Sequence, residues 1–104
     1  MKIMSPMDEA EHSIRLLIAD DHRLFRQGLG EICVTRGGFS LAAEAENGKE
    51  AVEAVQRTNP DVVLMDIRMP VLDGVQATRL ITAAHPDIPV IVLSQLSRAP
   101  ETRD

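Results

Sequence analysis

The sequence predicts a single α/β domain built on a parallel β-sheet. Short apolar runs, typical of strands buried on both faces, alternate along the chain with stretches of helical periodicity. Two of these runs end in carboxylates, at Asp20-Asp21 and at Asp66, and each helical stretch is followed within two residues by glycine or proline. An alternation of strand, helix and strand favours parallel strands joined by right-handed crossovers.

The first half of the chain supplies two strands and two helices. Residues 14–19 form an apolar run that is followed by acidic turn residues, which is typical of a buried strand. Apolar residues recur at helical spacing over residues 22–36, and a glycine pair then ends the helix. Residues 39–45 are weakly apolar and suit a short edge strand, and residues 48–58 form a second amphipathic helix that ends at an Asn-Pro pair.

The second half repeats the pattern. Residues 61–65 are predicted to form the central strand. Asp73 can cap a third helix through its side-chain oxygen, with Val75 and Ile81 facing inward, until a His-Pro pair ends the helix. Residues 88–93 complete a βαβαβαβ order, which predicts four parallel strands.

The length and composition bound the domain organisation. A chain of 104 residues is within the length of one domain, and we expect it to fold over residues 14–94. Residues 1–13 are predicted to be a flexible leader and residues 95–104 a tail. No run has the length of a signal peptide or of a membrane span, and Cys33 is the sole cysteine, so a cytoplasmic setting without membrane contact is expected.

The charge balance bears on the choice of partner. Sixteen acidic residues against eleven lysines and arginines give a formal net charge of -5. Binding to nucleic acid requires clustered basic side chains on one face. We therefore expect no direct binding of nucleic acid by this chain.

Three carboxylates are predicted to meet at one edge of the sheet. Asp20 and Asp21 follow the first strand, and Asp66 closes the third. Ligands of parallel α/β sheets bind outside the carboxyl ends of the strands. Carboxylates that lie so near to one another repel, which destabilises the fold unless a cation or a proton offsets their charge. This points to a divalent metal and phosphate chemistry. The alternative for Asp20 and Asp21 is that they only cap the following helix.

The ordered set of motifs resembles one known family. The segments are Ile-Ala-Asp-Asp-His at 18–22, Asp-Ile-Arg-Met-Pro at 66–70, Asp-Gly at 73–74, and a strand that ends at Ser94. Together they resemble the receiver domain of two-component response regulators, most closely the NarL/LuxR type. That resemblance implies a flavodoxin-like parallel sheet, of order 2-1-3-4 in this chain.

The resemblance also implies a role for each residue of the motifs. Asp66 would accept a phosphoryl group from a sensor histidine kinase, in a site that contains Mg²⁺. Asp20, Asp21, Asp66 and the backbone carbonyl of Arg68 would hold the metal. Ser94 would hydrogen-bond the phosphoryl oxygen as a switch hydroxyl, although a hydroxyl at a strand end is also an ordinary turn residue. His22, at the start of a helix, is interpreted as a surface residue.

The sequence departs from the family pattern after Ser94. The resemblance implies a fifth strand that ends in a lysine, together with two further helices, but no lysine follows Lys49. We therefore expect an incomplete receiver that lacks these elements. Its unfinished sheet edge predicts self-association.

Two rival functions remain. Phosphatases of the haloacid dehalogenase type also place an aspartate after a strand, but they need a second carboxylate two residues later, where this chain has Arg68. We therefore expect no enzymatic turnover. The other rival is a phosphorylation-independent interaction module or a non-functional receiver fragment, which the missing lysine favours.

Overall fold

A computed structural model describes residues 13–93 of the chain, in which strands and helices alternate. The elements are β1 (Ile14–Ala19), α2 (Arg23–Gly37), β2 (Phe39–Ala45), α3 (Gly48–Thr58), β3 (Val62–Asp66), α4 (Gly74–Ala84) and β4 (Val90–Leu93). Every predicted strand and helix is confirmed, with bounds that differ by two residues at most. Ser94, the tail and the first twelve residues lie outside the described residues.

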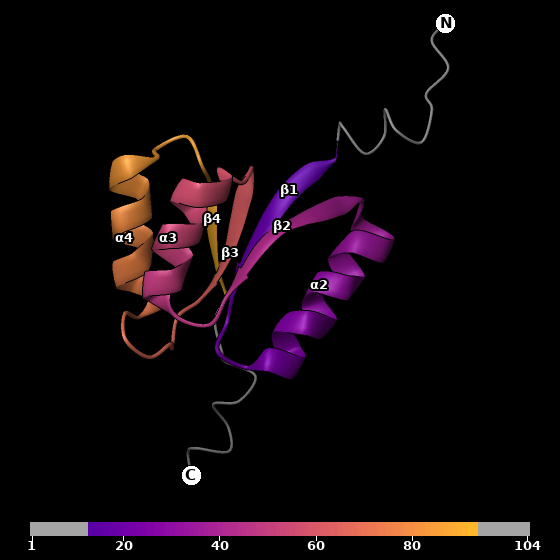
Figure 1. Cartoon of the computed structure of the whole chain (residues 1–104), viewed down its shortest axis with the longest axis horizontal. Helices are drawn as coiled ribbons and strands as arrows, with labels where there is room; N and C mark the ends of the chain where they lie inside the picture. The colour runs from indigo at the N-terminus through magenta and orange to yellow at the C-terminus, as the bar shows by residue number, and fades with distance from the viewer. Residues whose placement is uncertain (1–12, 94–104) are drawn as a thin grey trace, which may run out of the picture.

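The four strands form one parallel sheet of order β2-β1-β3-β4, as predicted. The pairing brings the carboxyl ends of the strands to one edge, which is at the bottom in Figure 1. Ala19, the last residue of β1, pairs with Ala45 on one side and with Met65 on the other. The residues that follow β1 and β3 therefore emerge side by side.

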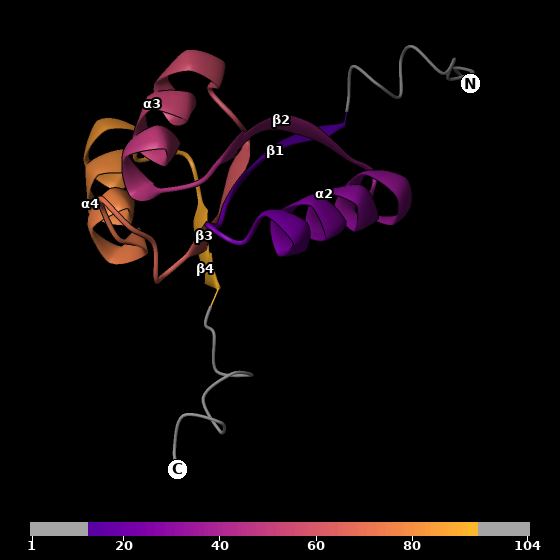
Figure 2. The ribbon, with the colours of Figure 1, turned by 60° about the horizontal axis from the view of Figure 1, so that its bottom comes forward.

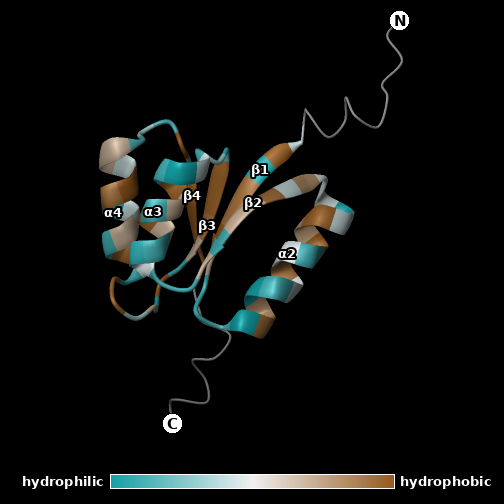
Figure 3. Ribbon diagram, in the orientation of Figure 1, coloured by the Kyte–Doolittle hydropathy of each residue, from teal (hydrophilic) through white to brown (hydrophobic). Residues whose placement is uncertain are grey.

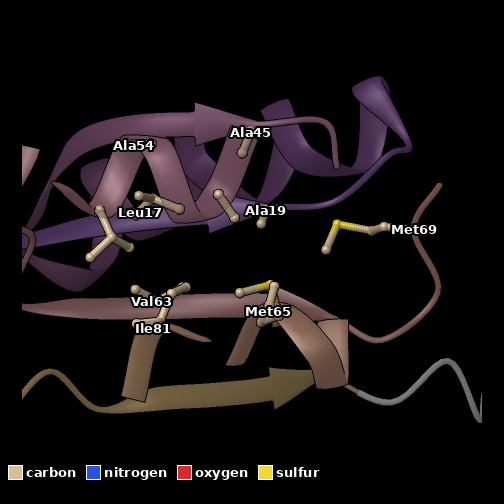
Figure 4. Packing of buried hydrophobic residues seen from close by; sticks show 11 residues of the cluster. Leu17, Ala19, Ala45, Ala54, Val63, Met65, Met69 and Ile81 are labelled. Atoms are coloured by element: carbon tan, nitrogen blue, oxygen red, sulfur yellow. The ribbon is translucent and has the colours of Figure 1, made fainter. Parts of the chain in front are cut away.

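Helices cover the two faces of the sheet unequally. Figures 1 and 2 show α3 and α4 together on one face and α2 on the other. The main core lies under α3 and α4 and is aliphatic, as the scarcity of aromatic residues predicts. Figure 4 shows this core, with Met69 reaching from the loop after β3 toward Ala19 and Met65. Its fully or nearly fully buried members are Leu17, Ala19, Ala45, Ala51, Ala54, Val55, Val63, Met65, Met69, Ala77 and Ile81.

Helix α2 buries only part of the apolar pattern that marks it as a helix in the sequence, because Leu29 and Cys33 are half-buried and the other apolar positions are exposed. Leu24 is 85% exposed and Ile32 is 58% exposed, whereas Arg26 and Gly30 are the buried residues. Figure 3 shows apolar colour on β1 and β3 and also on parts of α2. None of the helices within residues 13–93 is long and apolar enough to cross a membrane.

The orientation of α4 differs from the prediction at one position. Ile81 is buried as predicted, but Val75 is 42% exposed, so its inward placement was wrong. The buried residues of the helix are Gly74, Ala77 and Ile81, which follow at intervals of three and four. Gly74 fixes this face, because it packs directly against the backbone of β3.

Candidate metal centre

The predicted carboxylates come together at the edge formed by the strand ends. Asp20 follows β1 and Asp66 ends β3, and both side chains are fully buried, whereas Asp21 is exposed. Each of these aspartates and His22 offers one ligand atom, and the four atoms lie within 4.8 Å of one another. The grouping of Asp20, Asp21 and Asp66 was predicted from the sequence; the inclusion of His22 was not.

Asp20 is held in place by several hydrogen bonds. Its backbone N–H donates to the carbonyl of Ala45 at 3.0 Å, and its own carbonyl accepts from Nη1 of Arg26 at 2.7 Å. The side-chain Oδ1 accepts from the backbone N–H of His22 at 2.7 Å. The other oxygen, Oδ2, is buried and has no hydrogen-bond partner among the described residues. A buried carboxylate oxygen of this kind is costly unless a cation or a donor reaches it.

The loop after β3 is held close to Asp66. The backbone N–H of Gly74 donates to the carbonyl of Ile67 at 2.7 Å, and a Cβ atom on Gly74 would lie 2.0 Å from the carbonyl oxygen of Asp66. Only a glycine fits there. Asp73 caps α4 as predicted, since its Oδ1 accepts from the backbone N–H of Gln76 at 2.8 Å.

The same loop contains a strained turn. The N–H of Leu72 donates to the carbonyl of Pro70 at 2.7 Å, so Val71 is the central residue of a γ-turn, and its φ is 70°. Positive φ is unfavourable for a β-branched residue. Leu72 in turn meets α3, because a Cβ atom on Gly48 would lie 2.0 Å from the carbonyl oxygen of Leu72. The loop is thereby fixed at both ends beside the acidic cluster.

Two predicted site residues are not tested by this geometry. Arg68 is exposed in the loop two residues after Asp66, and its backbone carbonyl stays a predicted metal ligand. Ser94 lies outside the described residues, so its switch role also stays a prediction.

Arg26 supports the site and was missed in the sequence. Its side chain is 7% exposed, and Nε donates to Oε1 of Glu44 at 2.7 Å while Nη1 donates to the carbonyl of Asp20. The arginine therefore ties α2 to β2 and to the end of β1. The sequence did contain one sign of this role, since Arg26 is a charged residue between the apolar residues Phe25 and Leu29 of the predicted helix. The apolar residues nevertheless define the predicted buried face of the helix.

The donor set fits a hard divalent cation. Carboxylate oxygens are the ligands that Mg²⁺ prefers, and this ion keeps several waters besides one or two protein carboxylates. The unpartnered Oδ2 of Asp20 points to the same conclusion, since a bound cation would offset the buried charge. The residues present therefore suit Mg²⁺.

Comparison with known proteins agrees with this geometry. A family model described as the response regulator receiver domain matches residues 16–104. The transcriptional regulatory protein DegU of Brevibacillus brevis is 48% identical over 84 residues, which are 81% of this chain and 36% of that protein. The chain thus spans little more than a third of the length of that relative.

Solved structures give the same result. The signal receiver domain of NarL from Mycobacterium tuberculosis is 33% identical with a TM-score of 0.74, over 79% of this chain and 66% of that chain. A chain of the CheX–CheY–BeF₃–Mg²⁺ complex from Borrelia burgdorferi is 29% identical with a TM-score of 0.74, over 86% of this chain and 68% of that chain. The chain belongs to the response regulator receiver domain family of two-component systems.

Proposed function

We propose that this chain accepts a phosphoryl group on the carboxylate of Asp66 from a sensor histidine kinase. The observation that supports this most is the placement of Asp66, fully buried at the end of β3 and within 4.8 Å of the ligand atoms of Asp20 and Asp21. A buried carboxylate beside two others is costly in a metal-free protein, which fits a site that works with a cation. Membership of the family supports a histidine kinase as the partner.

The chemistry needs little beyond positioning. A carboxylate oxygen of Asp66 forms the new P–O bond as the P–N bond to the donor histidine breaks, and the imidazole leaves with the electron pair. Mg²⁺, when bound, neutralises charge between the acceptor and the incoming phosphate. Asp20 and Asp21 would hold it, together with the carbonyl of Arg68. The hydroxyl of Ser94 would hydrogen-bond the transferred group.

This reaction modifies the protein instead of turning over an external substrate. We therefore propose that the chain is not itself an enzyme and that it works in the cytoplasm, where its kinase would present the phosphohistidine.

The second candidate is a phosphorylation-independent interaction module. It is favoured by β4, which is an edge strand in the described part of the sheet and has Ile91 and Val92 50% and 42% exposed. The two candidate functions differ in whether Asp66 must be able to accept a phosphoryl group.

A small phosphodonor tests the proposal. Incubation with Mg²⁺ and acetyl phosphate should give one phosphoryl adduct per chain by intact-mass spectrometry, and Asp66→Asn should abolish it. Asp73→Asn is the matched control, because Asp73 lies in the same loop and asparagine keeps its role as helix cap. An adduct of equal yield on Asp66→Asn and on the parent would remove Asp66 from the mechanism.

A further inference from the structure

The imidazole of His22 lies directly against the acidic cluster. Its Nδ1 is 3.2 Å from Oδ1 of Asp20 and 3.1 Å from Oδ1 of Asp21. The side chain is 48% exposed, and His22 is the N-cap residue of α2 without using its side chain as a cap. A histidine at this place is therefore not needed to begin the helix.

These separations fit neighbouring corners of a metal coordination shell. Ligand atoms lie about 3.0 Å apart around an octahedral ion with bonds of about 2.1 Å. They lie about 3.3 Å apart around a tetrahedral ion with bonds of about 2.0 Å. The measured 3.1 and 3.2 Å fall between these values. The ligand atoms of His22, Asp20, Asp21 and Asp66 also lie within 4.8 Å of one another. Opposite ligands of an octahedral ion with bonds of about 2.1 Å lie about 4.2 Å apart, so binding by all four requires the cluster to contract slightly.

A second observation points independently to a cation. Oδ2 of Asp20 is buried and has no hydrogen-bond partner among residues 13–93, in a side chain that is 1% exposed. Oδ1 of the same carboxylate already accepts the N–H of His22. A positive ion in the cluster would satisfy the oxygen that the protein leaves unpartnered.

We propose that the pocket also binds a divalent transition metal, with Nδ1 of His22 as a ligand beside the carboxylates. The inference extends the metal site of the proposed function. Imidazole suits ions such as Co²⁺ and Zn²⁺, which bind nitrogen and oxygen ligands more tightly than the strictly oxygen-preferring Mg²⁺ does.

The test measures selectivity on the full chain. Co²⁺ and Mg²⁺ are titrated separately by calorimetry into the parent, into His22→Ala and into the control His85→Ala. His85 is the C-cap residue of α4 and is not among the four clustered residues, which are Asp20, Asp21, His22 and Asp66. The ratio of Co²⁺ affinity to Mg²⁺ affinity should fall at least about tenfold in His22→Ala and stay constant in His85→Ala. Hyperfine-shifted imidazole C–H resonances in the Co²⁺ complex should disappear in His22→Ala alone.

The outcomes separate this inference from the proposed function. An unchanged Co²⁺/Mg²⁺ ratio in His22→Ala, or a Co²⁺ spectrum without imidazole signals in the parent, overturns the inference while Mg²⁺ binding and labelling of Asp66 persist. Binding of Co²⁺ through His22 in a parent that fails to take phosphate upholds the inference and contradicts the proposed function.

Discussion

Asp20 shows how a single residue of this site is fixed by its surroundings. Its backbone is hydrogen-bonded to β2 on one side and to the guanidinium of Arg26 on the other, and its Oδ1 accepts the N–H of His22. The carboxylate has no freedom to turn away, so its unpartnered oxygen stays inside the cluster. Asp21, with a side chain 34% exposed, has no comparable restraint and can turn toward an ion.

The two aspartates should therefore differ in their effects on metal binding and stability. We expect Asp21→Ala to weaken Mg²⁺ affinity by about tenfold or more, and by more than Asp20→Ala does, because the resemblance to receiver domains gives Asp21 the position closer to the ion. Asp21→Ala should leave stability unchanged or raised, because it relieves repulsion between carboxylates. Asp20→Ala should cost about 1 kcal/mol, since it removes the acceptor for the N–H of His22. Mg²⁺ titration and urea unfolding check both, and equal Mg²⁺ affinity in the parent and both variants would show that neither aspartate holds the ion.

Arg26 gives a second prediction at the same scale. Arg26→Met keeps much of the aliphatic volume but removes the donors to Glu44 and to the carbonyl of Asp20. We expect the free energy of unfolding to fall by about 1–3 kcal/mol, because a buried carbonyl loses its partner. Arg23→Met is the matched control on the exposed side of the same helix and should change stability by less than about 0.5 kcal/mol. Equal urea midpoints for the two variants would contradict a structural role for Arg26.

The sequence located the carboxylates of the site but not their supports. Asp20, Asp21 and Asp66 could be predicted because strand ends share one edge of a parallel sheet, a rule that needs no side-chain geometry. His22 and Arg26 depend on where α2 sits relative to the sheet. Helical periodicity alone does not settle this, because the apolar positions of α2 lie on two sides: Leu29 and Cys33 are half-buried on the face of Arg26 and Gly30, whereas Leu24 and Ile32 are exposed.

At the scale of elements, glycines determine how closely the helices approach the site. A Cβ atom on Gly74 would lie 2.0 Å from the carbonyl oxygen of Asp66, so the start of α4 touches the end of β3 without any side chain between them. This contact sets the orientation of α4, with Ala77 and Ile81 inward and Val75 outward. The prediction that Val75 faces inward was wrong because apolar residues lie on two sides of this helix in the sequence. The contact at Gly74 determines which of the two sides faces the sheet.

Two glycine-to-alanine changes should have opposite effects. Gly74→Ala forces α4 away from Asp66, and we expect a loss of about 3 kcal/mol or more together with weaker Mg²⁺ binding. Gly28→Ala is the control, because nothing lies within 4 Å of a Cβ atom there and alanine favours the helix interior. It should stabilise the protein by about 0.5–1 kcal/mol. Thermal melting ranks the variants, and a Gly74→Ala protein as stable as the parent would show that the loop moves freely.

At the scale of the whole molecule, the two faces of the sheet are unequal. The face under α3 and α4 contains the closed aliphatic core, whereas α2 leaves Leu24, Phe25 and Ile32 largely exposed on its own side. The two edge strands of the described sheet also differ. Glu44 of β2 forms an ion pair with Arg26, but β4 is composed of Val, Ile, Val and Leu and has no charge to discourage pairing.

The alternation of elements predicted four parallel strands with right-handed crossovers, and the resemblance to receiver domains implied their order. The sequence could not predict which apolar side chains would be left uncovered. Ile91 and Leu24 are apolar residues like those of the core, yet they are 50% and 85% exposed. Burial of such residues depends on what packs against them, which is a property of the assembled molecule.

The exposed edge leads to a prediction about association. We propose that chains pair through β4, so the parent should form dimers or larger species by light scattering at concentrations well above micromolar. Val92→Lys should reduce this association, because a charge on an edge strand disfavours pairing with a second strand. Val75→Lys is the matched control, since Val75 and Val92 are both 42% exposed and, within residues 13–93, only Val92 belongs to an edge strand. A monodisperse parent with a sharp cooperative melt, or equal effects of the two lysines, would show that β4 is not the contact surface.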